Sequence, residues 1–278
     1  MIQINELSFK YGNKEVLSHI TMDLEAGKIY GLLGENGAGK TTLLKIISGL
    51  QKPYHGDCRV LGENPFNRTP SFLNRIFYLP EEIDYIQNDY SALHFASLNA
   101  PFYPKFDMEK YKKILIEFDL DGNNKMSKLS HGQAKKAAIS FAVASNVDIL
   151  LLDEPSNGLD IPSKTKFRKI MAEYCLDTTC TLISTHQVRD LENLIDPIII
   201  LDNRAVLLNE SLENIAEKLC FTIESSVPSD ALYSEPTLGG YLCVKENKIE
   251  RESKVNLEIL FNATMQHKAL INKLFNNK

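Results

Sequence analysis

The sequence predicts an α/β fold, in which a mixed sheet carries helices on its faces. Three short apolar runs have the length and composition of strands buried in such a sheet: Val147–Leu152, Cys180–Ser184 and Ile198–Leu201. Segments with helical spacing of apolar residues lie between strands, and this alternation is typical of helices packed on a sheet. A glycine-rich loop between a fourth strand and a helix is the third observation that favours this fold class.

The N-terminal segments are expected to form an antiparallel β-layer ahead of that loop. Residues Ile2–Phe9 alternate apolar and polar in part, as a half-buried strand does, and Val16–Leu24 resembles a second strand. Lys28–Leu33 then predicts a short apolar strand, and Leu43–Ile47 the first turns of a helix.

The loop between that strand and helix, Gly34–Thr42, fits the phosphate-binding pattern G-x-x-x-x-G-K-[ST]. Glycines let the backbone turn its N–H groups toward phosphates, and the helix N-terminus adds a partial positive charge. In this pattern Lys40 reaches the outer phosphates and the hydroxyl of Thr41 ligates Mg²⁺. An incidental glycine-rich turn is the alternative, which the flanking strand and helix disfavour. The chain is therefore expected to bind a nucleoside triphosphate through Asn36, Gly37, Ala38, Gly39, Lys40, Thr41 and Thr42.

A mostly helical insertion is expected from about residue 80 to 145. Prolines punctuate its first half, and Met108–Phe118 carries helix-spaced apolar residues. After about Leu212 the pattern weakens, and the helical-looking segment Asn256–Asn276 predicts a small α+β tail.

Two carboxylates, Asp153 and Glu154, follow the strand Val147–Leu152, where α/β folds place their ligands. Asp153 is positioned to hold Mg²⁺, and Glu154 to polarise an attacking water. Alone, such a pair would more often cap the next turn. The phosphate-binding loop earlier in the chain reverses that preference.

A third pattern, Leu129–Gln133, precedes a helix expected over Ala134–Ser145. Ser130 and Gln133 fit a capping box. A serine, a glycine and a helix N-terminus are also suited to bind a phosphate, and both interpretations can hold together.

The composition is that of an ordinary globular protein, with 44% hydrophobic and 24% charged residues among 278. A net charge of -5 argues against electrostatic binding to nucleic acid, so no nucleic-acid partner is expected. The five cysteines form no C-x-x-C pair and fit reduced thiols. Without an apolar stretch of membrane-spanning length or a signal segment, a cytoplasmic location is expected.

In this order, the motifs resemble those of ABC transporter nucleotide-binding subunits, over roughly the first 210 residues. Gly34–Thr42 is similar to the Walker A loop, Leu150–Glu154 to the Walker B strand and Leu129–Gln133 to the LSGGQ signature. Ser156–Asp160 is similar to the D-loop, and Ser184–His186 to the switch-histidine segment.

The resemblance implies roles for further residues. Tyr11 falls where the family stacks an aromatic ring on adenine, and His186 where a histidine contacts the γ-phosphate and aligns the water. Alone, each would more often be an ordinary strand residue. The implied catalytic set is Glu154, His186 and Lys40, and the nucleotide-binding set adds Tyr11, Ser130, Gly132, Gln133 and Asp160 to the loop.

Two positions depart from the family pattern. Glu81 stands where the family usually has Gln, and it adds negative charge beside the phosphates. A carboxylate could still meet Mg²⁺ or its water, so the implied metal ligands are Thr41, Asp153 and Glu81. His131 stands where glycine is usual, and its side chain is expected to point away from the phosphates.

The implied protein is an ATPase that forms a head-to-tail homodimer with ATP at the interface. It would sit at the inner face of the cell membrane, bound to integral membrane transporter subunits. The expected domains are an ABC-type ATP-binding domain over 1–212 and a C-terminal extension over 213–278. Aromatic residues that could line the docking groove are Tyr85, Tyr90, Phe95, Phe102 and Tyr103.

The segment Leu257–Thr264 resembles the closing segment of subunits that serve drug- and polysaccharide-type exporters. An amphipathic helix is its simpler interpretation. Two other functions stay open: a soluble ABC-type ATPase with no role in transport, and a nucleotide-sensing module that does not hydrolyse ATP. The transported substrate contacts the membrane subunits, so this sequence does not identify it.

Overall fold

The computed structural model describes residues 1–83, 89–175, 177–248 and 251–275. Its central sheet has six strands: β3 (Ile29–Leu33), β5 (Ile76–Leu79), β6 (Ile149–Asp153), β7 (Cys180–Thr185), β8 (Ile198–Asp202) and β9 (Ala205–Glu210). Their order is β5-β6-β7-β3-β8-β9. The first five of these are parallel and β9 is antiparallel to β8, so the mixed sheet is confirmed.

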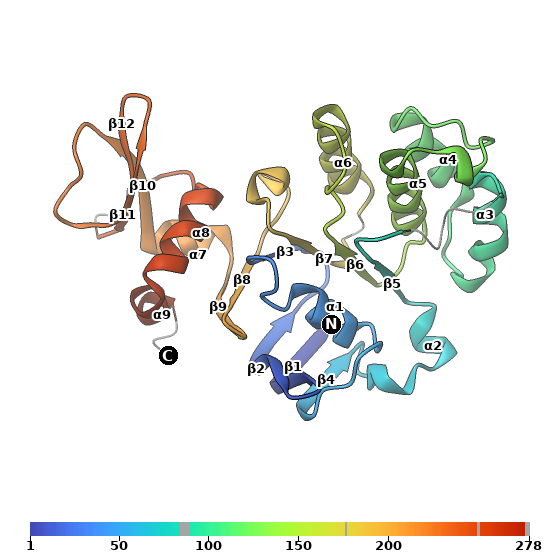
Figure 1. Cartoon of the computed structure of the whole chain (residues 1–278), viewed down its shortest axis with the longest axis horizontal. Helices are drawn as coiled ribbons and strands as arrows, with labels where there is room; N and C mark the ends of the chain where they lie inside the picture. Colours follow the sequence, from blue (N-terminus) through green and yellow to red (C-terminus); the bar gives the residue numbers. More distant parts are fainter. Residues whose placement is uncertain (84–88, 176, 249–250, 276–278) are drawn as a thin grey trace.

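The N-terminal antiparallel layer is also confirmed. It consists of β1 (Ile2–Tyr11), β2 (Lys14–Leu24) and β4 (His55–Val60), in the order β2-β1-β4. Helix α1 (Lys40–Ile47) lies between this layer and the central sheet (Figure 1). Leu43 and Ile47 of α1 are fully buried in the core that the two layers share. The start of α1 is thereby fixed at the edge of both layers.

The helical part contains α3 (Ala92–Asn99), α4 (Met108–Glu117) and α5 (His131–Ala144), with η3 (Ala100–Phe102) and η4 (Met126–Lys128) between them. It lies to one side of the central sheet, opposite the C-terminal part (Figure 1). The ring of Phe141 on α5 contacts those of Phe95, Tyr103 and Tyr111. Phe95 and Tyr103 therefore pack into the core of the helical part.

Helix α5 begins three residues before the expected Ala134, at His131. The reason is the cap, because Ser130 accepts a hydrogen bond from the N–H of Gln133 and allows the helix to start at once. Beyond the helical part, α2 (Pro70–Leu73) follows η1 (Pro65–Asn67), and α6 (Ile161–Tyr174) follows β6.

The C-terminal part adds η5 (Val188–Leu191), α7 (Leu212–Lys218), the strands β10 (Leu219–Glu224), β11 (Ala231–Thr237) and β12 (Gly240–Glu246), and the helices α8 (Leu257–Gln266) and α9 (Lys268–Phe275). The three strands form an antiparallel sheet in the order β10-β12-β11. The single helix expected over Asn256–Asn276 is wrong: it is broken at His267, whose backbone is not helical. Asn276 lies outside the described residues, as does Tyr85.

None of the helices in the described part of the chain has both the length and the apolar character needed to cross a bilayer.

Candidate functional site

The glycine-rich loop joins β3 to α1, and two of its glycines lie close to neighbouring atoms. Gly39, the N-cap of α1, has φ +107°, and a Cβ there would lie 2.8 Å from Cδ2 of Leu17. A Cβ on Gly34 would lie 2.5 Å from the carbonyl oxygen of Leu201. Gly39 is therefore required for its positive backbone angle, and any larger residue there would also displace the side chain of Leu17. Gly34 is required because a Cβ would clash with the backbone of Leu201.

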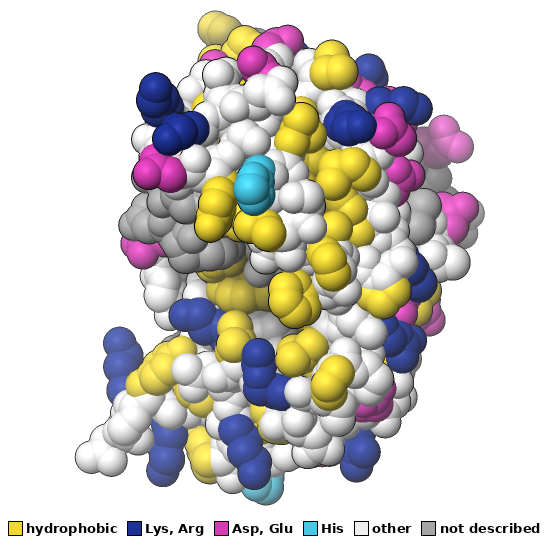
Figure 2. Space-filling model, turned by 90° about the vertical axis from the view of Figure 1, so that its right-hand side faces the viewer, with side chains coloured by type: hydrophobic (Ala, Val, Ile, Leu, Met, Phe, Trp, Pro, Cys, Tyr) yellow, Lys and Arg dark blue, Asp and Glu magenta, His cyan; other side chains and the backbone are white. Residues whose placement is uncertain are grey.

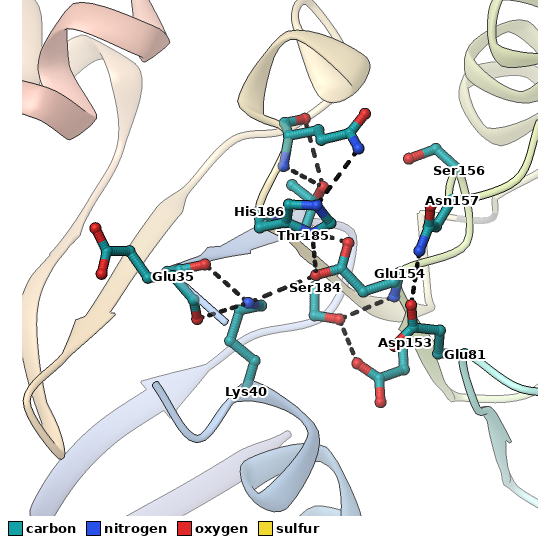
Figure 3. A network of polar contacts seen from close by, with 12 residues as sticks. Glu35, Lys40, Glu81, Asp153, Glu154, Ser156, Asn157, Ser184, Thr185 and His186 are labelled. Carbon is teal, nitrogen blue, oxygen red and sulfur yellow. Dashed lines mark hydrogen bonds and ion pairs between the residues drawn. The ribbon is translucent and has the colours of Figure 1, made fainter. Parts of the chain in front are cut away.

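Lys40 lies inside this loop. Its Nζ donates hydrogen bonds to the carbonyl oxygens of Gly34, at 2.8 Å, and of Glu35, at 3.1 Å. The same Nζ lies 3.5 Å from Oε1 of Glu154, and both side chains are buried (Figure 3). The loop thus encloses an ammonium group beside the N-terminus of α1, which is an arrangement suited to bind a polyphosphate. Thr41 and Thr42 follow in the first turn, where Thr41 is partly exposed and Thr42 is buried.

The two acids expected at the strand end are buried, with exposures of 1% for Asp153 and 5% for Glu154. Ser184 on the neighbouring β7 orients both. Its Oγ donates to Oδ1 of Asp153 at 2.6 Å and accepts from the N–H of Glu154 at 3.0 Å. The hydroxyl of Tyr78 donates to the other oxygen of Asp153 at 3.2 Å. Glu154 has φ +46°, an uncommon angle for a residue other than glycine, which these contacts help to hold.

His186 is brought to the acids by strand register. Because Asp153 on β6 is aligned with Ser184 on β7, the residues just beyond each strand end meet at one edge of the sheet. Nδ1 of His186 lies 3.0 Å from Oε1 of Glu154, although the contact lacks the geometry of a hydrogen bond. The structure therefore brings together Lys40, Glu154 and His186, with Asp153 adjacent.

Glu81, the departure from the family pattern, is held by two neighbours. Its Oε1 accepts a hydrogen bond from Nδ2 of Asn157 at 2.7 Å, and its carbonyl oxygen accepts one from Nζ of Lys135 at 2.6 Å. Across the described ranges, no three His, Cys, Asp or Glu side chains converge on a point that could hold a metal ion. The oxygens available at the loop are those of Thr41 and Asp153, which are the hard donors that Mg²⁺ prefers.

The capping box predicted at the start of α5 is confirmed. The N–H of Gln133 donates to Oγ of Ser130 at 3.2 Å, and Oε1 of Gln133 accepts from the N–H of Ser130 at 2.9 Å. A Cβ on Gly132 would lie 3.1 Å from the carbonyl oxygen of Gly158, so the segment packs against the turn after Glu154. Between described residues, no hydrogen bond or ion pair joins 130–133 to the loop 34–42.

Two other predicted nucleotide contacts lie apart from the cluster. Tyr11 is 46% exposed at the end of β1, with its ring edge-on to Phe9 at 4.8 Å. Asp160 is the N-cap of α6 and accepts a hydrogen bond from the N–H of Ser163 at 2.9 Å. Hydrogen bonding to Ser163 holds the pKa of Asp160 below its ordinary value. Pro162, in the first helical turn, is typical of a helix that starts at such a cap.

Sequence analysis missed two residues of the site. Ser184 was noticed only as part of the histidine segment, although it orients both acids. Lys135 is a fully buried lysine on a helix that is apolar on most of its faces, and a charge at such a position was the available signal.

A cavity lies elsewhere, between the central sheet and the helical part. It has a volume of about 590 Å³, and its lining includes Leu50, Ile76, Tyr78, Phe102, Tyr103 and Pro104. Figure 2 shows this side of the molecule, where hydrophobic side chains gather around a hollow. Phe102, in the lining of this cavity, is 69% exposed.

The chain is similar to known proteins over most of its length. A family model described as ABC transporter matches residues 17–157. The chain is 32% identical over 219 residues to YdbJ, an uncharacterized ABC transporter ATP-binding protein of Bacillus subtilis (strain 168), over 77% of this chain and 70% of YdbJ. It is 30% identical over 201 residues to the bacitracin transport ATP-binding protein BcrA of Bacillus licheniformis, over 71% of this chain and 65% of BcrA. It is 27% identical over 215 residues to ZnuC, the ATP-binding protein of a high-affinity zinc uptake system in Bacillus subtilis (strain 168), over 73% and 91%.

Solved structures share the fold. The ATP-binding subunit of an ABC transporter superimposes with a TM-score of 0.69 and 26% identity, over 77% of this chain and 91% of that subunit. A dimeric ATP-binding cassette in a post-hydrolysis state, bound to ADP and phosphate, superimposes with a TM-score of 0.67 and 22% identity, over 76% and 99%. These likenesses confirm the predicted α/β fold built on a phosphate-binding loop.

Proposed function

Because this chain belongs to the ABC transporter family of ATP-binding proteins, we propose that it powers an exporter by hydrolysing ATP at the cluster of Lys40, Glu154 and His186. The family makes the chain an ATP-binding subunit and an ATPase. The observation that supports this site most directly is the single carboxylate oxygen, Oε1 of Glu154, which lies 3.5 Å from Nζ of Lys40 and 3.0 Å from Nδ1 of His186.

In the proposed reaction Glu154 accepts the proton of the attacking water, and His186 aligns that water against the γ-phosphate. The ammonium of Lys40 offsets the negative charge that develops on the transferred phosphoryl group. Thr41 and Asp153 would hold Mg²⁺, which would neutralise phosphate charge. Glu81 would join them only by releasing Asn157, which binds its carboxylate in the present arrangement.

The rest of the nucleotide site is proposed to come from a second copy of the chain. Ser130, Gly132 and Gln133 have no described contact with their own loop, and the helix N-terminus they form is suited to bind a γ-phosphate. A head-to-tail dimer would place this N-terminus over the partner's loop, together with Asp160, which follows the turn that packs against Gly132. Tyr11 would stack on the adenine, because its ring is half-exposed at the end of β1.

Domain limits follow from this proposal. We assign residues 1–212 to the ATP-binding domain, with the helical insertion at about 80–145, and 213–278 to a C-terminal extension. The separate sheet β10-β12-β11 supports that division.

Membrane subunits are the expected partners of an ABC transporter ATP-binding protein. We propose that a cytoplasmic helix of such a subunit occupies the cavity between the central sheet and the helical part. The apolar lining and the exposed ring of Phe102 suit the apolar face of a helix. This contact would hold the chain at the inner face of the cell membrane.

Export is proposed because of the C-terminal part. The segment Leu257–Thr264, which resembles that of exporter subunits, forms most of α8. Uptake is the second candidate, because the zinc-uptake protein ZnuC is similar over 73% of this chain. A strain that lacks the chain should become more sensitive to toxic compounds if it exports, and should require more of a scarce nutrient if it imports.

The partner proposal is tested by purifying the tagged full chain from detergent-solubilised native membranes. A multi-spanning membrane protein should co-purify in stoichiometric amount, and the variant Phe102→Ala should lose it while keeping its ATPase activity. The matched control is Ile116→Ala, which replaces a similarly exposed apolar residue on α4, 71% exposed. This variant should still co-purify with the membrane protein. Recovery of ribosomal or DNA-bound proteins without a membrane protein would instead support a soluble ATPase with no role in transport.

A further inference from the structure

Two adjacent lysines anchor α5 at different places. Lys135 is fully buried, and its Nζ donates a hydrogen bond to the carbonyl oxygen of Glu81 at 2.6 Å. Lys136 is less buried, and its Nζ donates to the carbonyl oxygen of Phe118 at 3.3 Å, within the helical part. A buried ammonium is unfavourable unless negative or polar groups surround it. The burial of Lys135 therefore calls for an explanation that the less buried Lys136 does not need.

The groups around Lys135 belong to the catalytic edge. Burial lowers the pKa of its ammonium, and the carboxylates of Glu81, Asp153 and Glu154 act in the opposite direction. Helix α5 thus carries a positive charge toward the acids at the end of β6.

A short chain of hydrogen bonds runs from Lys135 to the turn that carries Glu154. Nζ of Lys135 holds the backbone of Glu81, and the carboxylate of Glu81 accepts from Nδ2 of Asn157 at 2.7 Å. The N–H of Asn157 in turn donates to the carbonyl oxygen of Glu154 at 3.1 Å. Figure 3 shows Glu81 and Asn157 side by side next to Glu154.

We propose that Lys135 is a positioning residue for ATP hydrolysis. By fixing the backbone of Glu81, it keeps the Glu81–Asn157 pair in place, and that pair holds the turn on which Glu154 sits. A displacement of α5 would then change the position of Glu154 through these hydrogen bonds. The inference rests on the proposed catalytic role of Glu154.

The test is a double-mutant cycle in the full-length chain with Mg²⁺ and ATP. Lys135→Met should lower kcat about tenfold or more and change KM for ATP less than about twofold, because the binding loop is untouched. Asn157→Ala should lower kcat as well, and the double variant should be no slower than the slower single variant, since both act through Glu81. Lys136→Met, which removes the neighbouring anchor, should leave kcat unchanged.

If the two effects on kcat multiply in the double variant, Lys135 and Asn157 act independently and the inference is wrong. The same holds if kcat of Lys135→Met falls only in proportion to the folded fraction seen by circular dichroism. Should Lys135→Met not fold, Lys135→Gln keeps a donor and enters the same cycle. Glu154→Gln separates the proposed function from the inference about Lys135. If this variant retains turnover, the catalytic site itself is wrong. If it loses turnover while the effects of Lys135→Met and Asn157→Ala multiply, only the role of Lys135 is wrong.

Discussion

Nδ1 of His186 lies 3.0 Å from Oε1 of Glu154, at the ends of two neighbouring parallel strands. The histidine side chain remains partly exposed, whereas the carboxylate is buried. The imidazole is therefore positioned to contact both the buried carboxylate and a group that enters from solvent.

Replacing His186 by alanine is expected to lower kcat for ATP hydrolysis about a hundredfold, because the group that aligns the water is lost. KM for ATP should change little, since Lys40 and the loop are retained. Steady-state ATPase kinetics check this. A rise in KM with kcat unchanged would mean that His186 only helps to bind ATP.

The head-to-tail dimer is testable by mixing two inactive variants, Lys40→Ala and Ser130→Arg. In a mixed dimer one site carries both defects and the other carries neither. An equal mixture should recover about a quarter of wild-type ATPase activity if the sites act independently. No recovery, despite mixed dimers detected by differential tagging, would contradict a site shared between two chains.

Gly39→Ala is expected to destabilise the fold and abolish ATP binding. The backbone angle alone costs about 1 kcal/mol for alanine, and the contact with Leu17 adds to it. Gly62→Ala is the control, because its φ of +80° imposes similar strain but nothing lies within 4 Å of a Cβ there. Thermal unfolding and nucleotide titration should show a larger loss of stability and of ATP affinity for Gly39→Ala than for Gly62→Ala. Equal losses would contradict the claim that close neighbours at the loop exclude a side chain at position 39.

Asp148, directly before β6, forms ion pairs with Arg75 and Lys105. These pairs predict that the stability of the fold depends on pH. Partial burial raises the pKa of Asp148, but hydrogen bonds from Lys105 and Arg75 outweigh burial and hold the pKa below its ordinary value. The stabilisation is therefore present above the unfolded-state pKa, about 3.9, and is lost as pH falls through the lower folded-state pKa.

Asp148→Asn should lower the free energy of unfolding by about 1 kcal/mol at pH 7, a modest value because both cations are partly exposed. The difference from wild type should shrink as pH falls below about 4. Denaturant unfolding at several pH values measures it. Asp57→Asn, which breaks an exposed pair with Arg59, should have almost no effect. A difference for Asp148→Asn that persists unchanged at low pH would contradict the assignment.

Much of the central fold could be predicted because its strands are buried on both faces. β6 and β8 are nearly continuous apolar runs, which are typical of a parallel sheet, and β7 combines apolar residues with small Thr and Ser side chains that are also buried. β4 could not be found this way, since His55–Val60 is polar and mostly exposed and is a strand only through its pairing with β1. The break at His267 was missed for a similar reason, because apolar spacing continues across it into α9.

The site was predictable where local sequence places its residues and not where tertiary contacts do. The loop around Lys40 and the acids after β6 follow from short motifs. The hydrogen bond between Glu81 and Asn157 joins residues far apart in the sequence, and the burial of Lys135 depends on the packing of α5 against the core. The first contact leaves no pattern in the sequence, and the only sign of the second is a charged residue on a mostly apolar helix.

The most direct test of the catalytic site is ATP turnover by Glu154→Gln, measured with its state of association. The variant should lose more than about a hundredfold in kcat while still binding ATP, because glutamine keeps the shape of the side chain but cannot accept the proton. It should also accumulate as an ATP-bound dimer in analytical ultracentrifugation. Unchanged turnover would show that Glu154 is not the catalytic base and would contradict the proposed mechanism.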